Sequence, residues 1–205
     1  MSRPARRKAS YEDLLALPEH QVGEIIAGEL HAHPRPAPRH ARAYSALTGT
    51  LWNPYDSGNG GPGGWWILDE PELHLGEDVL VPDLAGWRRE RLPRLPETPW
   101  FELAPDWVCE ILSPSTARVD RVLKMPVYAR EGVGHLWLVD PDLQTLEVYR
   151  LDTTQDSPHW LLLESLEGNA PVRQPPFDAI EFPLGSLWAE PPAGEAPDAD
   201  AEPDR

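Results

Sequence analysis

Trp107-Val108-Cys109-Glu110-Ile111-Leu112 is a short apolar run, interrupted by one acid, near the middle of the chain. Its aromatic and β-branched residues predict a central β-strand, which Pro114 should end. Strand alternation places Glu110 on the same face as Val108 and Leu112. An ionised carboxylate in such an apolar row requires a metal ion or another cation beside it. The alternative is an acid on an edge strand that faces water.

The segments on either side predict helices mixed with hairpin strands, and therefore an α/β (α+β) domain with a mixed sheet. The expected helices cover residues 10–17 and 40–52, and a third carries the apolar face Val119, Val122, Leu123, Pro126 and Val127. The expected strands are two pieces within residues 24–30, then 65–75, 79–87, 107–112, 135–140, 145–150 and 160–165. The glycine-rich stretch 53–64 is expected to be a mobile loop.

Asp83 is a second acid that stands alone among apolar residues, within the expected strand 79–87. Pro82 removes a ladder hydrogen bond, so the strand should be irregular or near an edge there. Asp83 taken alone is equally well explained as a turn residue. If the strands that carry Asp83 and Glu110 lie side by side, both carboxylates point to one place.

Lys124 stands out because arginine supplies sixteen of the eighteen basic residues. An ammonium group on a flexible stem differs from a guanidinium in reach and in how readily it loses a proton. Asp120, Lys124 and Tyr128 recur every four residues, as a stripe beside the apolar face of the third helix. Chemistry at Lys124 is one interpretation, and a plain ion pair with Asp120 is the other.

Length and composition fit one domain, expected over residues 10–188, between a flexible basic arm (1–9) and a disordered acidic tail (189–205). The tail carries six acids and one arginine, a net of −5, so −11 of the total charge of −16 remains on the rest. No apolar run reaches the roughly 20 residues that span a bilayer. With one cysteine and no secretory signal, a cytoplasmic location is expected.

The acidic charge does not favour binding to polyanions such as DNA. Basic residues nevertheless gather in two clusters, Arg88, Arg89, Arg91 and Arg94 in one, and Arg118, Arg121, Lys124 and Arg130 in the other. The two clusters follow Asp83 and Glu110 along the chain. They are interpreted either as phosphate contacts or as scattered solvated side chains.

Four further signals are weaker. His31 and His33 share a strand face at a spacing seen in metal sites, but solvated histidines are the better interpretation. His40 opens a helix beside several arginines, so it is either a phosphate contact or a helix-start residue without a catalytic part. Cys109 should be a small core residue on the face opposite Glu110, and Trp65-Trp66 give only a weak indication of base stacking.

Six motifs follow one another along the chain: Gly23 to Leu30 with Glu24, His40, Val81-Pro82-Asp83, Glu110 to Thr116, Asp120 with Lys124, Tyr128 and Gly132-Val133, and Leu136 to Pro141. In this order they resemble the Uma-two (Uma2) family, whose members are described as putative restriction endonucleases of the PD-(D/E)xK superfamily. The resemblance covers residues 10–188 and implies a restriction-endonuclease-like core, a mixed β-sheet flanked by helices.

The resemblance also implies an enzyme, a magnesium- or manganese-dependent endonuclease that hydrolyses DNA. Asp83 matches the PD aspartate, Glu110 the (D/E)xK acid and Glu24 an additional acid of the family. Together with the Ile111 carbonyl they would hold the metal. The chain departs from the pattern at Leu112, where a lysine is usual, and Lys124 takes that role.

An alternative class remains open: an inactive relative that serves as an interaction or nucleic-acid-binding module. The intact acids and Lys124 favour the enzyme, whereas Leu112 and the acidic charge favour the alternative. A zinc protein built on His31 and His33 is a third class. Many nucleases of the superfamily cut as dimers, so a homodimer is also raised, although the sequence shows no dimer surface.

Overall fold

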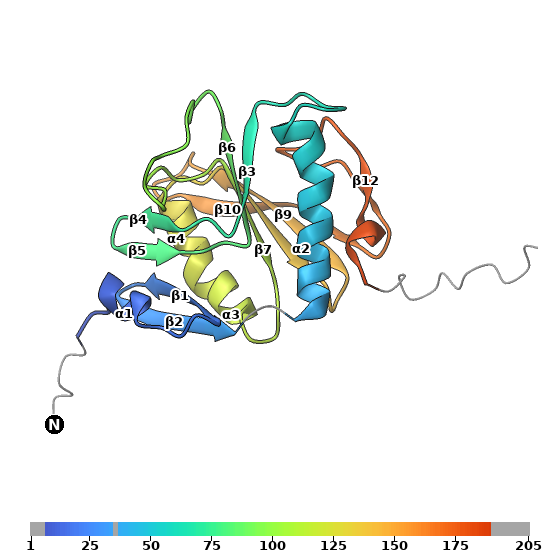
Figure 1. Cartoon of the computed structure of the whole chain (residues 1–205). Coiled ribbons are helices and arrows are strands. Elements are labelled where there is room, and N and C mark those ends of the chain that lie inside the picture. Colours follow the sequence, from blue (N-terminus) through green and yellow to red (C-terminus); the bar gives the residue numbers. More distant parts are fainter. Residues whose placement is uncertain (1–6, 35–36, 190–205) are drawn as a thin grey trace, which may run out of the picture.

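A mixed six-stranded β-sheet forms the centre of the computed structural model, which describes residues 7–34 and 37–189 (Figure 1). Its strand order is β10-β9-β8-β7-β6-β3, and only the β7–β8 pair is parallel. The strands are β3 (Trp65–Asp69), β6 (Leu84–Arg88), β7 (Trp107–Ile111), β8 (His135–Asp140), β9 (Thr145–Asp152) and β10 (His159–Glu167). The prediction of a central strand at β7 is therefore confirmed.

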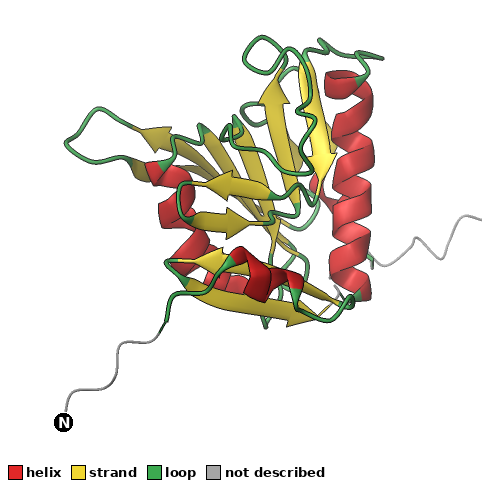
Figure 2. Ribbon diagram, turned by 60° about the vertical axis from the view of Figure 1, so that its left-hand side comes forward, coloured by secondary structure: helices red, strands yellow, loops and turns green. Residues whose placement is uncertain are grey.

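A second, four-stranded sheet lies beside the first, and the short helix α1 (Tyr11–Leu15) leads into it (Figure 2). Its order is β2-β1-β5-β4, from β1 (Gln21–Ile26), β2 (Glu29–Pro34), β4 (Leu73–Leu75) and β5 (Asp78–Leu80). A two-stranded sheet of β11 (Pro171–Val172) and β12 (Phe182–Pro183), followed by the 3₁₀ helix η3 (Leu184–Leu187), completes the described chain.

Helices cover both faces of the large sheet. Helix α2 (Pro38–Leu51), continued by the π-helical turn η1 (Trp52–Asp56), packs on the face that contains Cys109. The other helical stretch, α3 (Ala117–Val119), η2 (Asp120–Lys124) and α4 (Met125–Arg130), packs on the opposite face. The alternation expected along β7 is confirmed, because Cys109 belongs to the first core and Val108 to the second.

Two expected strands are each divided between the two sheets, which corrects the sequence prediction. The stretch 65–75 becomes β3 and β4, and 79–87 becomes β5 and β6. Glu70 breaks the first stretch with a left-handed φ of 45°, and Pro82, which cannot donate a ladder hydrogen bond, breaks the second. The N–H of Glu70 donates to the carbonyl of Asp83 at 2.9 Å, so the two breaks lie side by side.

Two other expectations are partly wrong. Residues 52–56, at the start of the expected mobile loop, form a π turn in which Tyr55 is buried and its hydroxyl accepts the N–H groups of Ala179 and Ile180. Val122, expected on the apolar face of the third helix, is 55% exposed. The π turn η2 rotates that part of the helix, so Asp120 and Lys124 are buried instead.

Residues 1–6 of the expected arm, and the expected tail apart from Ala189, lie outside the described residues. Within 7–34 and 37–189 there is no helix of the length and apolar character needed to traverse a bilayer.

A substitution at Phe177 tests the packing of the core between helix α2 and the large sheet. The side chain of Phe177 is 1% exposed and contacts the rings of Tyr55, Trp65, Trp107 and Trp137. The Phe177→Ala variant should lose about 3–5 kcal/mol of unfolding free energy, because the cavity it leaves cannot close among rigid rings. Urea denaturation measures this loss.

The matched control is Leu143→Ala, because Leu143 is 71% exposed. Its unfolding midpoint should stay close to that of the parent. Equal midpoints for the parent and Phe177→Ala would contradict a core packed around Phe177.

Candidate active site

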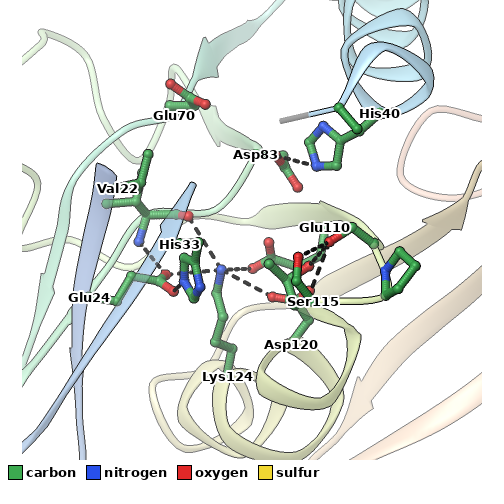
Figure 3. A pocket seen from close by; sticks show the side chains of 15 residues that line it. Val22, Glu24, His33, His40, Glu70, Asp83, Glu110, Ser115, Asp120 and Lys124 are labelled. Carbon is green, nitrogen blue, oxygen red and sulfur yellow. Dashed lines mark hydrogen bonds and ion pairs between the residues drawn. The ribbon is translucent and has the colours of Figure 1, made fainter. Parts of the chain in front are cut away.

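A cavity of about 280 Å³ opens where the two sheets separate (Figure 3). The four side chains singled out in the sequence, Glu24, Asp83, Glu110 and Lys124, all line it. They come from β1, the β5–β6 connection, β7 and η2, four segments far apart in the chain. The structure therefore brings the expected residues together in one place.

Asp83 is anchored at the end of the central strand. Because β6 and β7 pair with Leu84 opposite Cys109, the residue before β6 reaches the last residues of β7. Oδ2 of Asp83 accepts the backbone N–H of Ile111 at 2.7 Å. This bond holds the Asp83 carboxylate beside the neighbouring Glu110.

Lys124 is buried among carboxylates from three elements. Its side chain is 3% exposed, and Nζ lies 2.8 Å from Glu110 Oε1, 3.0 Å from Glu24 Oε1 and 3.5 Å from Asp120 Oδ1. It also donates to the carbonyl of Val81 at 3.3 Å. The simple ion pair with Asp120 proposed as an alternative is thus the longest of these three contacts.

Glu110 is buried at the centre of this network. Besides the contact with Lys124, its Oε1 accepts the hydroxyl of Tyr128 at 2.6 Å. Burial, followed by the charges of Asp120, Asp83 and Glu24, raises its pKa well above the ordinary value, against the opposing charge of Lys124. The interpretation of Glu110 as a water-facing edge acid is wrong.

The pKa values of Lys124 and Asp120 respond to burial in different ways. Burial alone would lower the pKa of Lys124, but Glu110 and Glu24 raise it well above normal, so the amine stays an ammonium ion. Burial raises the pKa of Asp120. The cavity is therefore lined by the carboxyl groups of Glu24, Asp83, Glu110 and Asp120 and by one lysine ammonium.

Glu24 is held by three donors. Lys124, His33 Nε2 at 2.9 Å and the N–H of Val81 at 2.8 Å all contact its carboxylate. Although burial would raise its pKa, the charge of Lys124 and these hydrogen bonds lower it to about 2. Glu24 is therefore ionised at any ordinary pH.

The prediction that His33 is a solvated residue is wrong. The hairpin pairs Val22 with His33 and Glu24 with His31, so His33 lies diagonally across from Glu24 on the same face. The short turn of this hairpin was the signal in the sequence, because it fixes the register. Since His33 bonds Glu24, one of the two histidines of the zinc alternative has another partner.

His40 is a second residue whose place the sequence left open. It lies in the first turn of α2, and its Nε2 is 3.2 Å from Asp83 Oδ1. Burial would lower its pKa, but the hydrogen bond and charge of Asp83 raise it. His40 therefore belongs to the cavity and not merely to the start of a helix.

Most arginines of the two basic clusters are engaged in ion pairs. Arg89 pairs with Asp56, Arg91 with Asp106, Arg121 with Glu147 and Arg130 with Asp78. Arg88 and Arg89 also lie over the rings of Trp65 and Trp66. Most arginines of the two clusters therefore have structural partners elsewhere in the fold. Their positive charges are neutralised there and do not offset the acidic residues around the cavity.

Comparison with known proteins supports the interpretation of these motifs. Residues 10–190 match the Uma2 family, described as "Putative restriction endonuclease". The chain belongs to the Uma2 family. Among curated proteins no significant match was found.

The Uma2 chain also resembles a solved structure. A protein from Anabaena variabilis ATCC 29413, described as a putative nuclease belonging to DUF820, has a crystal structure at 1.96 Å resolution. The two structures superpose with a TM-score of 0.63, and the sequences are 25% identical. The match covers 87% of this chain and 97% of the Anabaena chain. Both comparisons confirm the predicted family and its nuclease-like α+β fold.

The donor set in the cavity fits a hard divalent cation. Mg²⁺ and Mn²⁺ prefer carboxylate and carbonyl oxygens. Asp83, Glu110 and Glu24 offer carboxylates, whereas Ile111, whose carbonyl was expected to join them, is not among the residues that line the cavity. Within the described part of the chain, no three His, Cys, Asp or Glu side chains are already arranged as ligands. Figure 3 shows the ammonium of Lys124 between the carboxylates of Glu24 and Glu110, with which it forms ion pairs.

The Lys124→Met variant tests the buried ammonium. Methionine keeps an unbranched chain but leaves Glu24 and Glu110 without a counter-charge, so unfolding free energy should fall by about 3–5 kcal/mol. Urea denaturation at pH 7 measures it. The matched control is Lys8→Met, because Lys8 pairs with Glu77 in an exposed position and its loss should leave the unfolding midpoint close to that of the parent. Equal losses in both variants would show that the buried ammonium stabilises the fold no more than a surface pair does.

The depressed pKa of Glu24 predicts a pH dependence. Since this pKa falls from 4.5 to about 2 on folding, Glu24 stabilises the fold above pH 4.5, and this contribution is lost as the pH falls towards 2. The stability difference between parent and Glu24→Gln should therefore shrink over that range, by roughly 3 kcal/mol. Urea titrations at several pH values measure it.

Glu164→Gln is the control, because this glutamate is exposed on β10. It should follow the parent at every pH. A parent–Glu24→Gln difference that stays constant from pH 5 to pH 2 would rule out the depressed pKa.

Proposed function

We propose that this Uma2 protein is a metal-dependent endonuclease that hydrolyses phosphodiester bonds of DNA. The observation that carries the proposal is the convergence of Glu24, Asp83 and Glu110 with Lys124 on one cavity. An excess of carboxylates beside one amine matches the needs of phosphodiester hydrolysis, which requires a bound cation and a donor for phosphate oxygens.

Asp83 and Glu110 are the proposed principal ligands. The N–H of Ile111 fixes Asp83, while Tyr128 and Lys124 fix Glu110, so both carboxylates are oriented before a cation arrives. Glu24 would bind a second ion or steady the first ligands. A bound Mg²⁺ or Mn²⁺ would supply charge neutralisation at the phosphate and a water of lowered pKa.

Lys124 is proposed as a donor and not as a base. Glu110 and Glu24 raise the pKa of Lys124 well above its ordinary value, so the amine stays protonated. When a divalent cation takes over part of the carboxylate charge, the ammonium can orient the attacking water or stabilise charge on the phosphate. His40, beside Asp83, is close enough to the cavity to contact a neighbouring phosphate.

A module that binds nucleic acid or protein without turnover is the second candidate. The ion-paired arginines and the acidic charge favour it, because they leave little positive field for DNA. Leu112 in place of the usual lysine points the same way. Cytoplasmic location and a homodimer stay predictions.

Conservative changes at the two acids separate these candidates. In Asp83→Asn and Glu110→Gln, cleavage of supercoiled plasmid DNA with Mg²⁺ or Mn²⁺ should fall at least 100-fold, because amides are poor ligands for these ions. Calorimetry with Mn²⁺ should show binding to the parent and much weaker binding to both variants.

Glu164→Gln, which alters an exposed carboxylate on β10, should cleave DNA and bind Mn²⁺ like the parent. Chelation by EDTA should abolish cleavage. If the parent binds no Mn²⁺ and leaves the plasmid intact, the enzyme proposal fails and the second candidate replaces it.

A further inference from the structure

We propose that Tyr128 is a positioning residue for Glu110: its hydroxyl holds one carboxylate oxygen, so that the other faces the cavity. This inference rests on the proposed function, because it assigns the orientation of a ligand for a divalent cation. It concerns a residue that is not among those that line the cavity.

The contact itself is unusually well defined. Tyr128 is fully buried, and its hydroxyl donates to Glu110 Oε1 at 2.6 Å. Lys124 Nζ approaches the same oxygen at 2.8 Å. The hydrogen bond of Tyr128 and the ion pair of Lys124 therefore fall on the same oxygen of Glu110. We assign Oε2, the other oxygen, to a ligand in the cavity.

The geometry of the helix places Tyr128 on the same side of the helix axis as Asp120 and Lys124. In an α-helix, two residues four apart are offset by about 40° around the axis, and residues eight apart by about 80°. A π turn takes in an extra residue and offsets the drift in the opposite sense. Because η2 spans Asp120–Lys124, Asp120, Lys124 and Tyr128 all face the interior, at 4%, 3% and 0% exposure.

The proline after the π turn supports this geometry. Pro126 lies in the first turn of α4, where its missing N–H costs least, and it cannot donate back into the π turn. Val122, on the far side of the turn, is exposed. The local sequence therefore directs three polar side chains inwards at the expense of an apolar one.

A purely structural role explains this arrangement less well. Phenylalanine would fill the same space in the core without a hydroxyl that must find a partner. The hydroxyl of Tyr128 instead donates to Glu110 Oε1, inside the core. A buried donor beside a proposed ligand is what fixes a carboxylate's orientation.

The test compares Tyr128→Phe with Tyr149→Phe. Both remove a hydroxyl that donates to a glutamate, but Tyr149 bonds Glu147 on β9 and does not line the cavity. Calorimetry with Mn²⁺ should give a dissociation constant 10- to 100-fold higher for Tyr128→Phe, the usual effect of removing a ligand's supporting hydrogen bond. Tyr149→Phe should match the parent. Crystal structures of the parent and Tyr128→Phe without added metal should show Glu110 in different orientations.

The outcomes separate this inference from the proposed function. A parent that binds Mn²⁺, together with a Tyr128→Phe variant of equal affinity and unchanged Glu110, overturns the positioning role and leaves the metal site intact. A parent that binds no Mn²⁺, although Glu110 moves in the variant, overturns the metal site and leaves the positioning role. Lower thermal stability with unchanged Mn²⁺ affinity would make Tyr128 a structural residue only. If Tyr128→Phe does not fold, Tyr128→Met gives the same comparison with a more adaptable side chain.

Discussion

The buried ammonium group of Lys124 is the contact on which the rest of the arrangement depends. It links Glu24 of the small sheet, Glu110 of the large sheet and Asp120 of its own helix, all within 3.5 Å. Removing one partner from a buried ionic network leaves a desolvated charge, which costs far more than a lost surface pair. Since a well-packed apolar residue would often stabilise a fold as well as a buried ion pair, stability alone does not explain this network.

The backbone creates the room for this network. The breaks at Glu70 and Pro82 divide two long strands between the two sheets, and the cavity lies where the sheets diverge. Asp83 directly follows the second break, so its carboxylate projects from irregular backbone towards the end of β7. A continuous strand through Asp83 would fix its side chain by sheet alternation alone.

The sequence predicted the parts of the site that depend on local pattern. The apolar row around Glu110 revealed a buried acid, and strand alternation placed Cys109 on the opposite face, as observed. The meeting of Asp83, Glu110 and Lys124 followed from the resemblance to a family, because no local pattern states which distant strands are neighbours. Spacing alone put Lys124 only at the rim of the core.

Other features depend on information that local pattern lacks. The contact of His33 with Glu24 needs the register of a hairpin, and the depth of Lys124 needs a π turn that apolar periodicity does not reveal. The division of the strands needs knowledge of the second sheet. The arginine clusters look basic in the sequence, yet acids from other elements neutralise them in the fold.

An acidic cavity in an acidic protein has a consequence for the proposed chemistry. A phosphate group approaching Glu24, Asp83 and Glu110 meets repulsion that one ammonium group cannot cancel, and the paired arginines provide little long-range attraction. A divalent cation held by the same carboxylates reverses the local sign and offers the phosphate a direct partner. On the proposed function, metal and DNA therefore bind cooperatively, since each lowers the electrostatic cost of holding the other. If the proposed function holds, the carboxylates that oppose DNA in the absence of metal make binding of the substrate conditional on the cofactor.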